Sequence, residues 1–123
     1  MTMRTVFRED HELFREQARR FIETEIVPNL HAWEQAGIVP KSLWRKAGEI
    51  GLLCSTVPEE YGGSGGDFGH SAVMIEELAR VNATAIGFTT HSEIVAPYLV
   101  AYGSEEQKQR WLPRMASGEL IGV

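Results

Sequence analysis

One stretch predicts the end of one helix and the beginning of the next: Gly103-Ser104-Glu105-Glu106-Gln107-Lys108-Gln109-Arg110-Trp111-Leu112-Pro113. We expect Gly103 to end the preceding helix in the left-handed conformation, which glycine adopts at little cost. Ser104 and Gln107 have the spacing of a capping box, in which each side chain satisfies a free backbone N–H at the helix start. Glu105 and Glu106 lie where the helix dipole favours negative charge. The stretch therefore predicts a helix from Glu105 to about Ala116.

The residues after this helix have a different pattern. Ser117-Gly118 is expected to close the helix, and Glu119-Leu120-Ile121-Gly122-Val123 reads as an apolar strand. A strand needs partners for its backbone groups, and little else in the sequence resembles a sheet. We therefore expect residues 1–118 to form one domain and residues 119–123 to lead into another.

Four more helices are predicted upstream from apolar residues that recur every three or four positions. They run from about Glu9 to Val27, from Pro40 to about Glu49, from about Phe68 to Val81, and from about Ala85 to Tyr102. Pro28 is expected to end the first helix. The first and third helices are expected to bury, among others, Leu13, Ala72, Ile75, Leu78 and Ala79. Residues 52–57 look extended, and 58–67 form a glycine-rich loop. The sequence thus predicts an all-α, up-and-down helical bundle of about five helices.

Composition excludes several classes of function. The 123 residues carry a net charge of −5 with scattered Lys and Arg, which argues against a nucleic-acid partner. The single cysteine, Cys54, excludes an internal disulfide and suits a reducing compartment, so we expect a cytoplasmic protein. Residues 81–104 carry one charge, Glu93, but no run of eighteen apolar residues. We therefore expect a buried helix there and no membrane span.

Three features have the residue types of a chemical site without its spacing. The loop Gly62-Gly63-Ser64-Gly65-Gly66 lacks the pattern of a phosphate-binding loop, so we interpret it as a tight surface turn. Cys54 has no neighbouring histidine in the sequence and is interpreted as a buried hydrophobe, not a nucleophile. The histidines show no metal-ligand spacing with each other or with Cys54, which favours structural roles and predicts no metal site; they are His11, His31, His70 and His91.

Two groups of carboxylates leave alternatives open. Glu76-Glu77 lies among apolar residues, which favours a structural ion pair with an arginine over a catalytic base. Glu93 is the only charge in a long apolar helix, where burial is costly without a partner. It either points to solvent or an adjoining domain, or belongs to a helix that lines a ligand cavity.

Five stretches, in this order and at this spacing, resemble the N-terminal helical domain of the acyl-CoA dehydrogenases over nearly the whole chain. They are Phe21-Ile22-Glu23-Thr24-Glu25-Ile26-Val27-Pro28, Ala47-Gly48-Glu49-Ile50-Gly51-Leu52-Leu53, Pro58-Glu59-Glu60-Tyr61-Gly62-Gly63-Ser64-Gly65-Gly66-Asp67, Glu76-Glu77-Leu78-Ala79-Arg80 and Gly103-Ser104-Glu105-Glu106-Gln107-Lys108. Two further pieces look most like the long-chain branch of the family: Trp33-Glu34-Gln35-Ala36-Gly37 and His91-Ser92-Glu93-Ile94-Val95.

The resemblance implies an FAD-dependent enzyme that dehydrogenates an acyl-CoA thioester and passes electrons to an electron-transfer flavoprotein. Residues 1–118 would be its N-terminal domain and 119–123 the first residues of a β-domain, followed by a C-terminal helical domain. A homo-oligomer, a tetramer or a dimer, is implied for the full-length enzyme. The family's flavin-contacting segment would begin just after Val123, and its catalytic glutamate lies farther downstream. We therefore assign no catalytic or cofactor-binding residue here, and expect the isolated chain to be inactive and flavin-free.

One helix of this chain would form a wall of the acyl pocket. The resemblance implies that it is the helix from Ala85 to Pro97, with side chains that face the fatty tail at Ile86, Thr89, Thr90, Glu93 and Ile94. Glu93 departs from the small or apolar residue expected there. The alternative reading is a non-catalytic helical protein-interaction module of the same ancestry.

Overall fold

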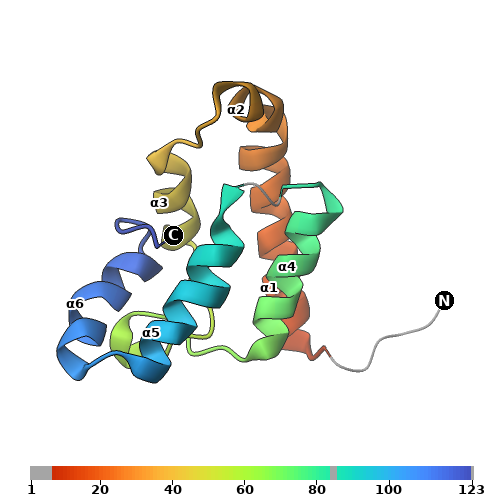
Figure 1. Cartoon of the computed structure of the whole chain (residues 1–123). Helices are drawn as coiled ribbons and strands as arrows, with labels where there is room; N and C mark the ends of the chain where they lie inside the picture. The colour runs from red at the N-terminus through yellow and green to blue at the C-terminus, as the bar shows by residue number, and fades with distance from the viewer. Residues whose placement is uncertain (1–6, 84–85, 123) are drawn as a thin grey trace.

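The computed structural model describes residues 7–83 and 86–122, and every regular element in this part of the chain is helical (Figure 1). In chain order the elements are α1 (Glu9–Phe21), the π-helix η1 (Ile22–Ile26), the 3₁₀-helix η2 (Val27–Asn29), α2 (Leu30–Ala36), α3 (Lys41–Glu49), the 3₁₀-helix η3 (Glu59–Tyr61), α4 (Phe68–Arg80), the π-helix η5 (Thr90–Val95), α5 (Ala96–Tyr102) and α6 (Glu105–Ala116). The all-α prediction is confirmed. Within the described residues no helix is long and apolar enough to span a bilayer.

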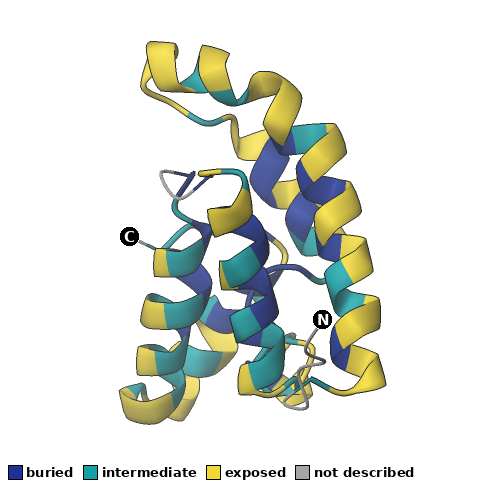
Figure 2. Cartoon of the chain, turned by 90° about the vertical axis from the view of Figure 1, so that its right-hand side faces the viewer, coloured by how far each residue is buried: buried dark blue, intermediate teal, exposed yellow. Residues whose placement is uncertain are grey.

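Two hydrophobic clusters hold the bundle together. The larger one joins α1, η1, α3 and α4 around residues such as Ile22, Trp44 and Leu78. The smaller one joins the loop near Cys54 to α5 and α6 through residues such as Leu112. Buried residues gather where these helices face one another, whereas α2 projects from one end and buries no residue (Figure 2).

The first predicted helix does not stop at Pro28. The chain passes through η1 and η2, and then continues into α2, which the sequence did not predict. Pro28 lies in the first turn of η2, where its missing N–H leaves no hydrogen bond unmade. The turn after α2 is made by Gly37, which has the left-handed φ of 73°. Pro40 precedes α3 as its N-cap residue, not as its first helical residue.

Gly103 ends α5 for a different reason from the predicted one. Its φ of −71° and ψ of 154° are extended, so no left-handed conformation is needed there. A Cβ at this position would lie only 2.6 Å from the carbonyl oxygen of Leu99. The close approach of the backbone to the last turn of α5, not the sign of φ, is what requires glycine.

The apolar tail does not form a strand in the described residues. Gly118, with φ of 82°, closes α6 as predicted and turns the chain back along it. The Leu120 N–H then donates to the Arg114 carbonyl at 3.0 Å, and the Gly122 N–H donates to His91 Nδ1 at 2.9 Å. The N–H groups of Leu120 and Gly122 are therefore satisfied by α6 and η5 in place of a sheet. Val123 lies outside the described residues.

The inward face of α4 is only partly the predicted one. Leu78 is buried as predicted, but Ile75 and Ala79 are exposed, as is Leu13 on α1. The rest of the buried face is lined by Ser71, Val73, Met74 and Glu77. A carboxylate thus occupies a position where the apolar spacing alone predicts a hydrocarbon side chain.

Glu77 is the centre of a buried ion-pair group that joins α1 to α4. Its carboxylate accepts hydrogen bonds from Arg15 Nη1 at 2.8 Å and from Arg19 Nε at 2.8 Å, and Arg80 Nε lies 3.4 Å away. Arg15 also pairs with Glu76 at 2.8 Å. The hydrogen bond from Arg19, supported by Arg15, outweighs burial and lowers the pKa of Glu77 to about 2. The prediction of a structural ion pair is confirmed.

Replacing this carboxylate should lower the stability of the bundle. Because the pKa of Glu77 is depressed, its contribution is fully present above about pH 4.5 and is lost as the pH falls towards about 2. We expect Glu77→Gln to reduce the free energy of unfolding at pH 7 by up to about 3 kcal/mol and to remove this part of the acid sensitivity. Urea unfolding between pH 7 and pH 2.5 measures both effects. The matched control is Glu76→Gln, at a partly exposed neighbour, which should cost less than about 1 kcal/mol. Equal losses in the two variants would contradict the assignment.

The predicted capping box at the start of α6 is confirmed. Ser104 Oγ accepts from the Gln107 N–H at 3.2 Å, and Gln107 Oε1 accepts from the Ser104 N–H at 2.9 Å. We expect Ser104→Ala to lower the free energy of unfolding by about 1 kcal/mol, and Ser104→Asp, which caps equally well, to be nearly neutral. Indistinguishable urea midpoints for the two variants would show that the cap does not stabilise the chain.

Candidate functional site

The helix predicted to run from about Ala85 to Tyr102 is present, but its helical run starts at Phe88 and most of its first half is the π-helix η5. Gly87 has φ of 98°, and the helical run starts after it, at Phe88. Ala85, where the helix was predicted to start, lies outside the described residues. A π-helix has a wider turn than an α-helix and recurs at functional sites. In η5 it sets which side chains face outward.

The five predicted wall residues fall into three groups. Ile86 is buried in the larger hydrophobic cluster. Thr89 and Glu93 are half-buried at the edge of the helix. Only Thr90 and Ile94 are exposed, one turn apart on the outer side of η5. The structure therefore exposes Thr90 and Ile94 on η5 and places Ile86 elsewhere, beside Trp33 and Trp44 at the α2 and α3 side of the core.

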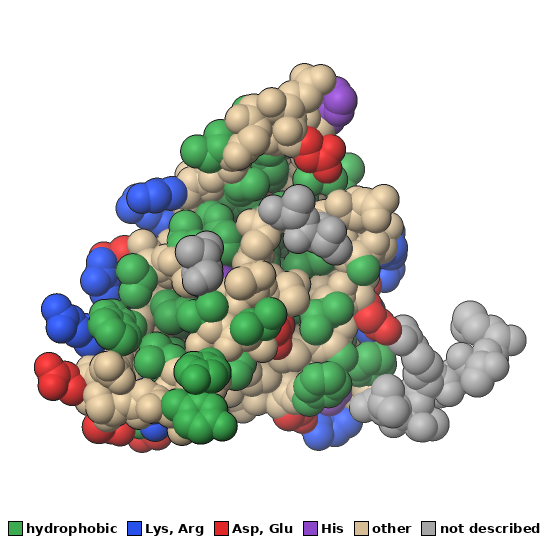
Figure 3. Space-filling model, in the orientation of Figure 1, with side chains coloured by type: hydrophobic (Ala, Val, Ile, Leu, Met, Phe, Trp, Pro, Cys, Tyr) green, Lys and Arg blue, Asp and Glu red, His purple; other side chains and the backbone are tan. Residues whose placement is uncertain are grey.

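Exposed apolar side chains extend this surface along two elements. Ile94, Tyr98 and Tyr102 follow one another at intervals of four and are 60%, 68% and 76% exposed. Phe68, 77% exposed, and Ile75 project from α4, which lies beside this helix. Figure 3 shows hydrophobic side chains gathered on this face. We call it the outer apolar face, defined by Thr90, Ile94, Tyr98, Tyr102, Phe68 and Ile75. Sequence reasoning missed the two tyrosines, although their spacing from Ile94 was visible.

A groove borders the outer apolar face. It has a volume of about 480 Å³ and is lined mainly by apolar and aromatic side chains of α5, α6 and the segment after α6, including Tyr98, Leu99, Trp111 and Leu120. Apolar surface of this extent, rimmed by polar residues, is typical of a surface that contacts a ligand or another domain.

Glu93 lies at the edge between η5 and α4. Burial raises the pKa of its carboxyl group above the usual value, and a hydrogen bond from the Ser71 hydroxyl opposes that rise. Ser71 is itself buried on α4. The carboxylate therefore has a partner within the chain and is neither fully solvated nor on the outer surface with Ile94.

His91 and Cys54 lie together on the inner side of η5. Although no histidine lies near it in the sequence, the Cys54 thiol has a histidine neighbour in space, with His91 Nε2 3.7 Å from its Sγ. That nitrogen donates to the Met115 carbonyl oxygen at 2.8 Å, so it offers no lone pair to deprotonate the thiol. Burial raises the pKa of Cys54 to about 12. The interpretation of Cys54 as a buried hydrophobe is confirmed.

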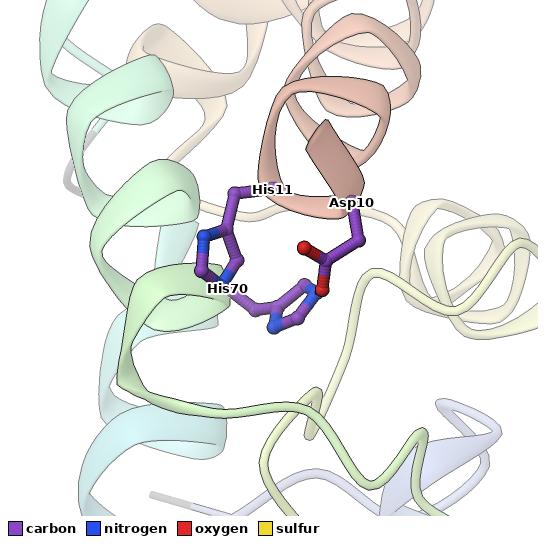
Figure 4. A group of neighbouring side chains, drawn as sticks. All are labelled: Asp10, His11 and His70. Carbon is purple, nitrogen blue, oxygen red and sulfur yellow. The ribbon is translucent and has the colours of Figure 1, made fainter. Parts of the chain in front are cut away.

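Two of the histidines come together despite their separation in the sequence. Figure 4 shows His11 and His70 beside Asp10, with the ligand-type atoms of all three residues within 4.8 Å of one another. Both Nδ1 atoms already accept backbone N–H bonds, His11 from Arg8 at 2.9 Å and His70 from Asp67 at 3.1 Å. The bond to His70 completes the capping box of α4, whereas the bond to His11 satisfies the N–H of the N-cap residue of α1, where the Arg8 side chain has no acceptor to cap the helix.

The remaining contacts of this cluster do not favour a cation. His11 Nε2 donates to Asp67 Oδ1 at 2.6 Å, and the Arg8 guanidinium lies 2.7 Å from Asp67 Oδ2. A metal needs an unprotonated ring nitrogen, and here it would also face a fixed positive charge. The arrangement therefore joins two helix starts, which agrees with the structural role expected for the histidines.

The glycine-rich loop is closely packed against the chain that precedes it. A Cβ on Gly63 would lie 2.1 Å from the Val57 carbonyl oxygen, and one on Gly66 would lie 2.8 Å from the Ser55 carbonyl oxygen. The Gly65 and Gly66 N–H groups donate to these same two oxygens, at 2.9 and 2.7 Å. Amides already used in this way cannot cradle a phosphate, so the interpretation as a tight turn is supported.

Comparison with known proteins gives a consistent assignment. Residues 8–119 match the family model for the acyl-CoA dehydrogenase N-terminal domain. The chain is 45% identical to the pig (Sus scrofa) mitochondrial long-chain specific acyl-CoA dehydrogenase over 98% of its own length and 28% of that protein. It superposes on an acyl-CoA dehydrogenase of Geobacillus kaustophilus with a TM-score of 0.91 and 47% identity, which covers 97% of this chain and 31% of the other.

A second solved structure, an acyl-CoA dehydrogenase from Bacillus anthracis complexed with FAD, superposes with a TM-score of 0.88 and 36% identity over 98% of this chain and 21% of the other. The family model and these alignments cover α1 to α6 and the outer apolar face alike. The chain therefore belongs to the acyl-CoA dehydrogenase family and corresponds to the N-terminal domain of that family.

Proposed function

We propose that this chain is the N-terminal domain of an FAD-dependent acyl-CoA dehydrogenase and forms one wall of the pocket for a fatty acyl chain. The proposal rests on the outer apolar face, where Ile94, Tyr98 and Phe68 are exposed. The chain that carries this face belongs to the acyl-CoA dehydrogenase family. A hydrocarbon tail and a neighbouring domain are both apolar surfaces that such a face can bury.

Each part of the wall has a separate task. Thr90 and Ile94 contact the acyl chain, whereas Ile86 is buried in the larger hydrophobic cluster and takes no part in the contact. Thr89 and Glu93 flank the contact surface, and the Ser71 hydrogen bond holds the Glu93 carboxylate at its edge. The wall excludes water from the acyl chain and orients it. We assign no proton transfer to any residue of this chain.

FAD is the cofactor of the proposed enzyme, and it accepts the hydride that leaves the acyl β-carbon. The outer apolar face offers side chains suited to an acyl tail, and the four glycine N–H groups of the loop at 62–66 already donate to backbone carbonyls within the chain. In keeping with the family assignment, we place the flavin contacts and the catalytic carboxylate in the remaining domains of the same polypeptide. Residues 119–123 lead into the first of these, a β-domain.

The proposed partners follow from the same assignment. They are an acyl-CoA substrate, an electron-transfer flavoprotein that removes the electrons, and further copies of the enzyme in a tetramer or dimer. The buried, unpaired Cys54 suits a reducing compartment, and we propose a cytoplasmic location. The matched pig protein is named as mitochondrial. Cell fractionation followed by detection of the chain in the soluble cytoplasmic fraction tests this location.

A non-catalytic helical interaction module is the alternative, since Tyr98 and Tyr102 are exposed in the way of protein-interaction residues. The visible spectrum separates the two readings. We expect the full-length protein to purify with about one flavin per chain and to reduce a dye acceptor with an acyl-CoA, whereas residues 1–123 alone should be colourless and inactive. A colourless, inactive full-length protein would favour the module, and a flavin-bound 123-residue chain would contradict our placement of the flavin contacts.

Chain-length preference tests the wall directly. We expect Thr90→Phe in the full-length enzyme to shorten the pocket, because an exposed position accepts the ring without disturbing the core. Each excluded methylene costs about 1–3 kcal/mol in specificity, so the ratio of kcat/KM for long over short acyl-CoA should fall about tenfold or more. The matched control is Thr24→Phe on the exposed side of η1, which should leave the ratio unchanged. An unchanged ratio for Thr90→Phe would remove this residue from the pocket.

A further inference from the structure

His91 is the most connected side chain of η5, and the proposed function gives it no task. It is completely buried, and its ring packs edge-on against Trp44 with centroids 5.1 Å apart. It lies between Thr90 and Ile94 in the sequence but points to the opposite side of the helix. The residues that face the acyl chain and the residue that faces the core thus share one turn of backbone.

Two hydrogen bonds of the ring reach two different parts of the chain. Nε2 donates to the Met115 carbonyl oxygen at 2.8 Å, at the end of α6. Nδ1 accepts from the Gly122 N–H at 2.9 Å, in the segment that follows α6. One ring nitrogen must carry a proton and the other a lone pair, so the neutral imidazole is the form that satisfies both. Burial lowers the pKa of His91 and favours that form.

The segment at Gly122 also packs through Leu120 and Ile121 against the two hydrophobic clusters, but its backbone bond to η5 comes from His91. Upstream, Leu120 N–H is bonded to the Arg114 carbonyl oxygen, and the Gly122 backbone lies against Val95 and Met115 so closely that a Cβ would come within 2.8 Å of Val95 Cγ1. The side chain of His91 therefore supplies the hydrogen bond that ties this segment to η5 across 31 residues of sequence.

We infer that His91 is a positioning residue, which fixes the acyl wall at Thr90 and Ile94 relative to the segment that leaves this domain at Gly122. This inference rests on the proposed function, in which the chain beyond Gly122 carries the flavin contacts and the base. The His91 side chain would then fix the position of the bound acyl chain relative to the reacting groups carried by the chain beyond Gly122. A small error in such a register is enough to slow a reaction markedly.

Two substitutions of His91 each keep one of its two hydrogen bonds and remove the other. In His91→Asn the amide oxygen lies near the position of Nδ1, so the bond from Gly122 is kept and the one to Met115 is lost. In His91→Gln the amide nitrogen reaches the position of Nε2, so the bond to Met115 is kept and the one from Gly122 is lost. Each variant loses one buried hydrogen bond, and a purely structural role predicts the same effect for both.

We expect the two variants to differ in the full-length holoenzyme. With His91→Gln, kcat for a long-chain acyl-CoA should fall at least about fivefold, with flavin content unchanged, whereas His91→Asn should stay within about twofold of the unsubstituted enzyme. The matched control is Ser92→Ala, which removes the buried bond from the Cys54 N–H at 3.0 Å without touching the segment at Gly122. Its thermal midpoint reports the cost of a lost bond in this part of the core, and its kcat should be unchanged.

Amide hydrogen exchange tests the tether without relying on turnover. The Gly122 N–H should exchange at least about tenfold faster in His91→Gln than in His91→Asn. Equal kcat values for the two variants, or equal Gly122 exchange rates, would overturn the inference. An unsubstituted enzyme that binds no flavin and shows no turnover would instead contradict the proposed function, and the exchange rates would still decide whether His91 holds the segment.

Discussion

The buried carboxylate of Glu77 is the constraint on which the arrangement of this domain depends. Its bonds to Arg15 and Arg19 fix the rotation of α4 about its own axis, because a buried charge separated from its partners is far more costly than a misplaced hydrocarbon. At about 100° per residue, Phe68 and Ile75 lie about 180° from Glu77 around the helix. Turning the carboxylate towards α1 therefore turns these two side chains outward. The ion pair that holds the core together also creates half of the outer apolar face.

Local signals in the sequence were sufficient for part of the fold. The Ser104 cap and the extent of α6 follow from residues that contact one another within a single turn, and these predictions were confirmed. The failures concern where the helices end and how closely neighbouring segments approach. Pro28 does not end the helical path because it lies in the first turn of η2, where its missing N–H is not needed, and α2 is hard to predict because it packs only Leu30 and Trp33 against the core and buries no residue fully. Gly103 is needed because of a carbonyl oxygen four residues away, not because of its own φ.

The helix that carries the candidate residues was predictable, but the directions of its side chains were not. Apolar periodicity and family resemblance point to the helix after Gly87, yet both assume α-helical spacing. The π-helical turns of η5 place Thr90 and Ile94 outside and His91 and Ser92 inside, while Thr89 and Glu93 fall between. Predicted site residues that are adjacent in the sequence, such as Thr89 and Thr90, therefore differ in how far they are buried. The bond between His91 and Gly122 spans 31 residues and has no signature in the sequence.

The Asp67 carboxylate has a consequence for the order in which the chain folds. It caps α4 locally, through the Gly69 N–H, but it also accepts from His11 and Arg8, which precede it by 56 and 59 residues. A contact that closes so long a loop costs chain entropy before it contributes stability. The first turn of α1 thus gains its outside partners only after α4 has docked. The beginning of the sequence is completed late in folding, and a ribosome must release residues beyond Asp67 before the first helix has all of its bonds.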